Sequence, residues 1–409
     1  MKLAKFFSAA GIVAMSMLGQ TANAEMFVCS VNTNQVLRYN EVTHEYLGVT
    51  ADTSIGLNGP FGLALGPLGD LFIINGNAGT IVRLDGTTFQ YKGVFANVGI
   101  PGLRGITFAP NGDLYMTIGS NSSVLRFNGQ TGELVKTAVL PGAGGLSGPF
   151  GVAVDFQDRI YVANTGGNNV LRYDGKTGEL IDEFIKAGSG NLQGPVGINF
   201  GPDGNFYVAS SINNKVARYD GQTGAYIDDF IKSGSGGLTN PRAIVFGSTN
   251  TDLFAGSANT NQVLQYDRST GNFVASVADG SSGLVNPRGI GFSPVPFMQV
   301  HASPSVVEVS PREIHRRFID INVDLKVADL IGPNTTIKLV SVKSNDATAT
   351  NPIPDVIGAR FGTDDRRFHL KVALNHDFSD RIYTITYQAT NAKGFSSFAT
   401  TTVTIKAGA

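Results

Sequence analysis

Short runs of alternating apolar and polar residues, separated by glycine-containing turns, recur between residues 26 and 294. In the plainest repeat, residues 197–200 are followed by the turn Gly201-Pro202-Asp203-Gly204 and by further runs at 205–209, 216–219 and 226–231. Alternation with a period of two predicts β-strands, and proline followed by glycine supplies the backbone angles of a tight turn. Each repeat therefore predicts four short strands.

An arginine in the third strand of each repeat marks the period. This position holds Arg38, Arg83, Arg126, Arg172 and Arg218, with Gln265 in the sixth repeat. The steps between them are 43 to 47 residues long. A period in the forties built from short strands is typical of a β-propeller with one four-stranded blade per repeat. We therefore expect six blades.

The two ends of the repeat region are out of phase with each other. Residues 26–48 supply the second, third and fourth strands of a blade, and residues 288–293 supply only a first strand. We expect the two ends to share one blade, with residues 289–293 beside residues 27–30. This closure removes the open sheet edges at which another chain could pair.

The pattern changes after Pro294-Val295-Pro296, where longer alternating runs such as 319–325 and 383–389 begin. Roughly seven strands in this stretch favour a β-sandwich. The predicted fold is thus all-β, with a propeller at 25–294, closed by its N- and C-terminal strands in one blade, and a sandwich at 297–409.

The first 24 residues have the pattern of a secretory signal peptide. Lys2 and Lys5 precede an apolar stretch at 6–18, and Ala22-Asn23-Ala24 is a small-residue cleavage site. We expect export to the periplasm or out of the cell, with no membrane span after removal of the signal. Cys29 is the only cysteine, so no internal disulfide forms, and its apolar neighbours predict a buried thiol.

Composition narrows the classes of function. The net charge is −1, charged residues make up 15%, and no basic stripe is interleaved with aromatics, which argues against nucleic acid as a partner. The propeller region has one histidine, His44, in a peripheral turn, and neither a Ser-His-Asp set nor a metal-spaced histidine pair. We therefore predict no catalytic residue, metal ligand or cofactor. Calcium at Asp364-Asp365 or at Asp377 with Asp380 is an alternative, although it requires about six oxygen ligands.

The repeats resemble NHL-type propeller repeats. The matching segments are Asn286-Pro287-Arg288-Gly289, Pro202-Asp203-Gly204 and Asn213-Asn214-Lys215-Val216-Ala217-Arg218-Tyr219. The aspartate usual at the end of the second strand is replaced by residues such as Asn164, Ser210 and Ser257. Some propellers related to this family are metal-dependent lyases or lactonases.

The C-terminal part is similar to bacterial immunoglobulin-like modules. The run from Tyr383 to Ala389, followed by Thr390-Asn391-Ala392-Lys393-Gly394, carries this resemblance. Asp380-Arg381-Ile382-Tyr383 resembles a tyrosine corner, in which a tyrosine hydroxyl bonds to upstream backbone. The resemblance implies an immunoglobulin-like β-sandwich.

Three arginines, Arg104, Arg242 and Arg288, open first strands, while Phe61, Phe150 and Val196 open the other three. First strands line the central channel of a propeller, so we expect a mouth that is basic on one side and apolar on the other. Guanidinium groups held rigidly there suit a carboxylate or phosphate. The alternative is that these arginines brace nearby loop carbonyls.

Asparagines gather in the loops between second and third strands, on the same face, and include Asn164, Asn213 and Asn259. Their amides could bind sugar hydroxyls or calcium, or they could simply form turns, since asparagine tolerates left-handed backbone angles.

The sequence as a whole predicts an exported binding protein. Its propeller loop face would capture an extracellular protein, a glycan or a small anionic ligand through these arginines and asparagines. The alternative is a metal-dependent lyase or hydrolase of the streptogramin-lyase or lactonase type. The oligomeric state does not follow from the sequence.

Overall fold

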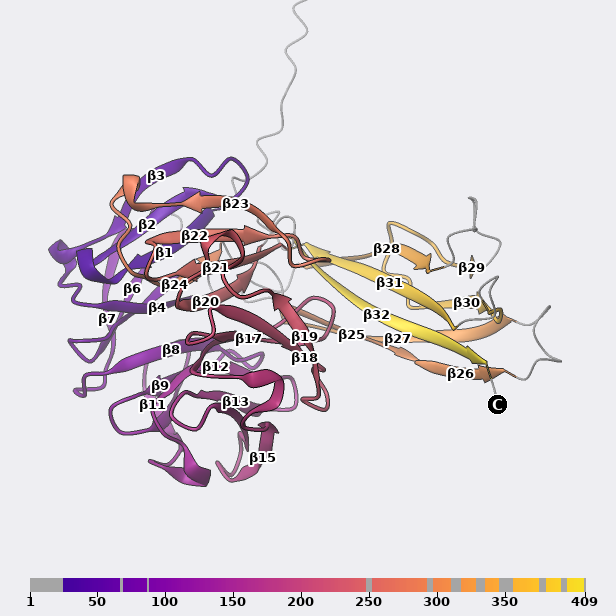
Figure 1. Cartoon of the computed structure of the whole chain (residues 1–409), viewed down its shortest axis with the longest axis horizontal. Helices are drawn as coiled ribbons and strands as arrows, with labels where there is room; N and C mark the ends of the chain where they lie inside the picture. Colours follow the sequence, from indigo (N-terminus) through magenta and orange to yellow (C-terminus); the bar gives the residue numbers. More distant parts are fainter. Residues whose placement is uncertain are drawn as a thin grey trace, which may run out of the picture.

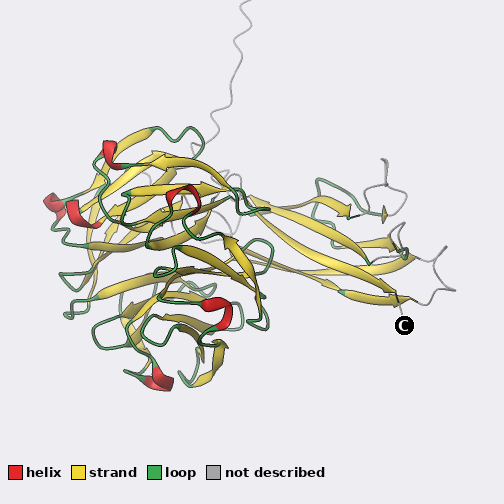
Figure 2. Cartoon of the chain, viewed as in Figure 1, coloured by secondary structure: helices red, strands yellow, loops and turns green. Residues whose placement is uncertain are grey.

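The computed structural model describes residues 25–66, 69–86, 88–247, 252–292, 297–309, 318–328, 335–345, 356–374, 380–390 and 396–407. The predicted signal peptide lies outside the described residues. β-Strands dominate the described part, which forms a broad multi-sheet unit and a narrower unit projecting from it (Figures 1 and 2). No helix in this part is long and apolar enough to cross a membrane.

The strands described between residues 25 and 292 form six four-stranded antiparallel sheets. Five of these sheets each contain four consecutive strands. They are β4 (Pro60–Leu65), β5 (Leu71–Asn75), β6 (Thr80–Leu84) and β7 (Tyr91–Asn97); β8 (Leu103–Phe108), β9 (Leu114–Ile118), β10 (Ser123–Phe127) and β11 (Leu134–Val139); β12 (Pro149–Val154), β13 (Arg159–Asn164), β14 (Asn169–Asp174) and β15 (Leu180–Ile185); β16 (Pro195–Phe200), β17 (Phe206–Ser210), β18 (Lys215–Tyr219) and β19 (Tyr226–Ile231); and β20 (Pro241–Phe246), β21 (Leu253–Ser257), β22 (Gln262–Tyr266) and β23 (Phe273–Ala278).

The remaining sheet joins both ends of this region, in the order β24 (Pro287–Phe292), β1 (Glu25–Ser30), β2 (Gln35–Asn40) and β3 (Tyr46–Ala51). Met26 faces Phe292 and Val28 faces Ile290 across the β1–β24 pair. Single 3₁₀ turns lie in the loops at η1 (Val31–Thr33), η2 (Thr53–Ile55), η3 (Ala143–Gly145), η4 (Ser189–Asn191), η5 (Ser235–Gly237) and η6 (Gly280–Ser282).

The inner strands make a closed ring. In ring order they are β24, β4, β8, β12, β16 and β20, each in contact with the next, and β20 contacts β24. Six apolar clusters lie between neighbouring sheets, so each sheet packs face to face on the next around the ring. This arrangement of radial sheets around a central channel is that of a β-propeller.

Close packing of the inner strands depends on glycine at the third position of most of them. A Cβ on Gly105 would lie 2.2 Å from the carbonyl oxygen of Phe150, and one on Gly197 would lie 2.2 Å from that of Arg242. Both are shorter than any tolerated contact, so larger side chains there would force the strands apart. Cys29 is fully buried beside this ring, as predicted, and burial raises the pKa of its thiol.

The second unit is a sandwich of two four-stranded sheets. One sheet has the order β25 (Phe297–Ser303), β27 (Phe318–Ala328), β30 (Arg367–Lys371) and β29 (Val356–Ile357). The other has the order β26 (Val306–Val309), β32 (Ser396–Ala407), β31 (Arg381–Thr390) and β28 (Thr336–Ser344), with β26 parallel to β32. Tyr383 is buried in the shared core, and its hydroxyl donates to the carbonyl oxygen of Lys371 at 2.9 Å.

The sandwich meets the propeller at the turn that follows β16. The backbone N–H and the hydroxyl of Thr400, on β32, donate to the carbonyl oxygen of Pro202 at 3.0 and 3.2 Å. A cavity of about 540 Å³ adjoins this contact. Pro202 follows the end of β16, whereas Val196 stands at its start. The sandwich is therefore attached at the face opposite the one where the inner strands begin (Figure 1).

Candidate functional site

The second residue of each inner strand stands at one mouth of the central channel. In ring order these residues are Arg288, Phe61, Arg104, Phe150, Val196 and Arg242. All six line one cavity of about 250 Å³ together with the residues that follow them on each strand. The expected division into a basic side and an apolar side holds in part. Arg242 lies next to Arg288, and Phe150 lies next to Val196, but Phe61 stands between Arg288 and Arg104.

Aromatic rings cover the faces of the three guanidinium groups. The Cζ atom of Arg104 lies 5.2 Å from the centroid of Phe150, and that of Arg242 lies 5.7 Å from the same ring. The Cζ atom of Arg288 lies 5.5 Å from the centroid of Phe61. Cation–π contact of this kind fixes the planes of the guanidinium groups. Their N–H edges are left as the groups that can bind a partner.

The arginines differ in how their N–H groups are used. Arg104 donates through Nη1 to the carbonyl oxygen of Gly148 at 3.4 Å, which is a long bracing contact. The Nε atoms of Arg242 and Arg288 are buried and have no hydrogen-bond partner among the described residues. A buried donor without an acceptor is unfavourable, and such groups are rare in folded proteins. The alternative that these arginines brace loop carbonyls therefore applies in part to Arg104. It does not account for the Nε donors of Arg242 and Arg288.

The electrostatics of the channel mouth are unbalanced. Burial, together with repulsion from Arg288 and Arg104, lowers the pKa of Arg242 to about 10. Burial and the charge of Arg104 lower the pKa of Arg288, and burial lowers that of Arg104. No aspartate or glutamate is among the described residues that line the cavity. Three positive charges thus converge without an opposing one among the lining residues that the structure describes.

The three asparagines proposed for ligand binding have structural partners. Asn164 is buried, accepts from the N–H of Ser147 at 2.7 Å, and donates to Asn169 at 2.7 Å. Asn213 donates to the carbonyl oxygen of Asn191, and Asn259 accepts from the side chain of Asn240 at 3.1 Å. These contacts tie loops together. None of the three has a left-handed backbone angle, which is found instead at the neighbouring Asn168, Asn214 and Asn261.

Other residues of the same loops tie each loop to the next sheet, a role that the sequence analysis did not assign to them. In five of the six sheets, the left-handed residue just before the third strand accepts a hydrogen bond from a backbone N–H 25 or 26 residues later. These pairs are Asn34 with Gly59, Ser122 with Gly148, Asn168 with Gly194, Asn214 with Asn240 and Asn261 with Asn286. The regular spacing of Asn34, Asn168, Asn214 and Asn261 was a signal in the sequence.

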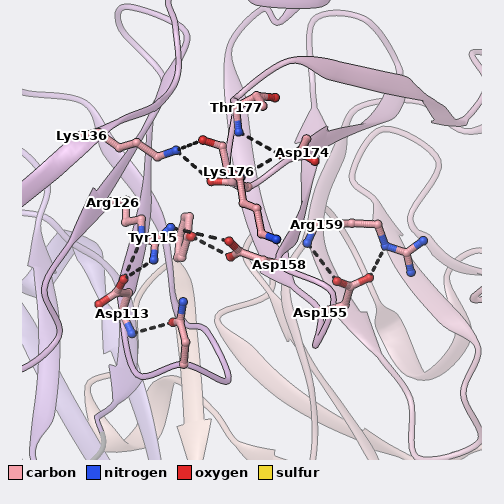
Figure 3. A network of polar contacts seen from close by, with 12 residues as sticks. Asp113, Tyr115, Arg126, Lys136, Asp155, Asp158, Arg159, Asp174, Lys176 and Thr177 are labelled. Carbon is pink, nitrogen blue, oxygen red and sulfur yellow. Dashed lines mark hydrogen bonds and ion pairs between the residues drawn. The ribbon is translucent and has the colours of Figure 1, made fainter.

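The arginines of the third strands lie away from the channel and are all ion-paired. The shortest pairs join Arg83 to Asp70, Arg126 to Asp113, Arg172 to Asp182 and Arg218 to Asp228, at 2.5 to 2.6 Å, and Arg38 meets Glu25 at 3.4 Å. Figure 3 shows one such network, in which Tyr115 also donates to Asp158, in the turn between β12 and β13 of the neighbouring sheet, at 3.1 Å. These contacts link strands within a sheet and link neighbouring sheets to each other.

The residues considered for metal binding do not come together in the described part of the chain. No group of three or more His, Cys, Asp or Glu side chains that could hold a metal ion occurs there. Asp364 pairs with Arg366 at 2.8 Å, and Asp365 accepts from the backbone N–H of Arg360 at 2.7 Å. His44 lies in the turn between β2 and β3, and Asp377 falls outside the described residues.

No known protein-family model matches the sequence, and no curated protein matches it either. Solved structures do resemble it. The structure of a nidogen/laminin complex is 12% identical, with a TM-score of 0.51 over 66% of this chain and 98% of that one. A protein of unknown function from Bacteroides caccae is 16% identical, with a TM-score of 0.51 over 66% of this chain and 99% of its own.

The virginiamycin B lyase of Staphylococcus aureus is 18% identical, with a TM-score of 0.48 over 66% of this chain and 87% of its own. At such identities a structural likeness shows the fold and not the activity. The repeated four-stranded sheets and the two neighbours with the higher TM-scores agree on a β-propeller.

Proposed function

We propose that this chain is an exported binding protein that holds an anionic group of its partner in the channel mouth. In this proposal residues 1–24 direct export to the periplasm or out of the cell. The six sheets are the blades of one closed NHL-like propeller. The sandwich is an immunoglobulin-like module that serves as a stalk, and the mouth faces away from it.

One observation carries the proposal: Arg104, Arg242 and Arg288 converge at the mouth with no carboxylate among the described lining residues. Charges of one sign, held together and partly withdrawn from water, destabilise a folded protein. Proteins retain such arrangements mainly at functional sites, where a ligand supplies the missing charge. The inner strands are rigid, so the site requires little reorganisation to bind.

The geometry favours an anionic group over a glycan. The asparagine amides that could have bound sugar hydroxyls already bond to neighbouring loops. The cavity of about 250 Å³ suits a small molecule, an acidic side chain or the C-terminal carboxylate of a protein. A protein partner also has support from the neighbour solved as a nidogen/laminin complex.

The test is calorimetric titration of the mature protein with acetate, succinate, phosphate and an acidic peptide. We expect saturable binding of at least one of them, which the double variant Arg242→Gln/Arg288→Gln should lose while its melting temperature stays at or above that of the wild type. Arg366→Gln on the sandwich, which removes one positive charge away from the mouth, is the control and should bind normally. Unfolding of the double variant would instead identify these arginines as braces.

A further inference from the structure

We infer that the channel mouth selects a ligand bearing two negative charges, as two carboxylates or as one phosphate, over a ligand bearing one. This inference deepens the proposed function and rests on it. It follows from the number of guanidinium groups at the mouth, from their positions in the ring and from the size of the cavity.

The charge at the mouth is of one sign. Arg104, Arg242 and Arg288 bring three positive charges to one small cavity, and the described lining contributes no acidic side chain. A ligand with a single carboxylate leaves a net charge of two there, whereas a dianion leaves one. Electrostatic attraction is stronger where water is partly excluded, so the second ligand charge should strengthen binding.

The three guanidinium groups are unevenly spaced around the ring. Arg242 and Arg288 lie on β20 and β24, which contact each other directly in the ring. Arg104 lies on β8, and β4, with Phe61 at the mouth, separates it from β24. The donors therefore form one adjacent pair and one separate group, which matches a ligand with two anionic ends or with several oxygens around one phosphorus.

Aromatic and aliphatic side chains surround the donors. Phe61 and Phe150 lie against the guanidinium faces, so the ligand meets N–H edges, which bond oxygen atoms in the guanidinium plane. Phe150 and Val196 are adjacent in the ring and uncharged, and provide a wall for a short carbon chain. A cavity of about 250 Å³ limits that chain to a few atoms.

The test compares succinate with monomethyl succinate, which have similar chains but differ by one charge. Titrations are carried out at constant ionic strength, because salt screens such interactions. We expect succinate or phosphate to bind at least about tenfold more tightly than monomethyl succinate or acetate. The tighter of succinate and phosphate identifies whether the two charges come from separate carboxylates or from one phosphate.

Arg104→Gln sharpens the test. If Arg242 and Arg288 hold one charge and Arg104 the other, this variant loses about tenfold in affinity for the preferred dianion and retains its affinity for the monoanions. Arg366→Gln again serves as the control, and thermal unfolding verifies that each variant is folded.

Equal affinities for succinate, phosphate and the two monoanions would overturn the inference and leave the proposed function standing. If the acidic peptide were the only ligand in the panel to bind, and the Arg242→Gln/Arg288→Gln variant lost this binding, the inference would again be overturned and the proposed function would stand. Failure of every anion in the panel to bind would contradict the inference and the proposed function together.

Discussion

Two regions of the propeller use arginine in opposite ways. In the third strands, each arginine meets a carboxylate, as in the pair formed by Arg172 with Asp182 at 2.5 Å. Burial of Arg172 opposes its charge, yet the hydrogen bond with Asp182 leaves its pKa above the usual value. At the channel mouth, burial and mutual repulsion lower the pKa of Arg242 to about 10. The same residue type is thus neutralised in one region and uncompensated in the other.

This difference separates paired from unpaired charge within a single repeat. The residue at the third-strand position bonds to a carboxylate in each of the six repeats. This holds even where the charge is lost, since Gln265 donates to Asp252 at 2.9 Å. The mouth position instead changes between arginine, phenylalanine and valine from sheet to sheet. The mouth position therefore varies among otherwise equivalent repeats, and it carries unpaired charge. A binding site on a repeat protein can be built at such positions, because the scaffold does not depend on them.

The largest effect should come from widening the ring on which the mouth is built. Gly197→Ala places a Cβ about 2.2 Å from the carbonyl oxygen of Arg242, so the backbones of β16 and β20 must separate. We expect the free energy of unfolding to fall by about 3 kcal/mol and anion affinity to fall with it. Denaturant unfolding and calorimetry measure both. Wild-type stability in this variant would mean that the inner strands are not packed as described.

Replacing one arginine from each region by methionine should change the stability in opposite directions. Arg172→Met removes a guanidinium that bonds to Asp182 and lies over Phe184, so stability should fall by about 2 kcal/mol. Arg288→Met removes an uncompensated charge while keeping contact with Phe61, so stability without ligand should rise by about 1 kcal/mol. Thermal unfolding of the two variants gives the signs directly.

If both methionine variants lose stability to a similar degree, the two regions do not differ as described, and Arg288 is a structural residue. A gain for Arg288→Met accompanied by loss of anion binding would be the expected trade between stability and function.

The smallest effect concerns turn aspartates, whose charges are satisfied mainly by hydrogen-bond donors of the turn. In the turn after β22, hydrogen bonds from the hydroxyl and N–H of Thr270 and the N–H of Ser269 lower the pKa of Asp267. A carboxylate whose pKa is lowered on folding stabilises the folded state at pH values above its ordinary pKa of about 4. This stabilisation is lost as the pH falls below that value. Because Asp267 is exposed, solvent screens the effect, and Asp267→Asn should cost only about 0.5 kcal/mol.

The measurement is the free energy of unfolding of wild type and Asp267→Asn at neutral and acidic pH. The difference between them should shrink on acidification. A difference that is unchanged or grows would show that the charge of Asp267 contributes nothing.

Sequence periodicity was sufficient to predict the repeated strands and the all-β class, because alternation and glycine turns are local signals. The phase of the repeats predicted that residues 289–293 would lie beside residues 27–30, and β24 pairs with β1 as expected. The pattern also identified the starts of the inner strands, and so it placed Arg104, Arg242 and Arg288 on the channel lining.

The state of these arginines could not be read from the sequence. Whether Nε of Arg242 finds an acceptor depends on loop carbonyls from other repeats, which only the folded ring brings near. The same applies to Asn164, whose side-chain amide is hydrogen-bonded to Ser147 and Asn169. Tertiary contacts, and not residue type, separated the proposed ligand-binding residues into unpaired and satisfied groups.

Anion binding at the mouth is tested most directly by a crystal structure of the mature protein determined with succinate or phosphate. We expect an oxyanion at the channel mouth within hydrogen-bond distance of the Nε or Nη atoms of Arg242 and Arg288. Density for the anion elsewhere, with these guanidinium groups turned onto loop carbonyls, would contradict it.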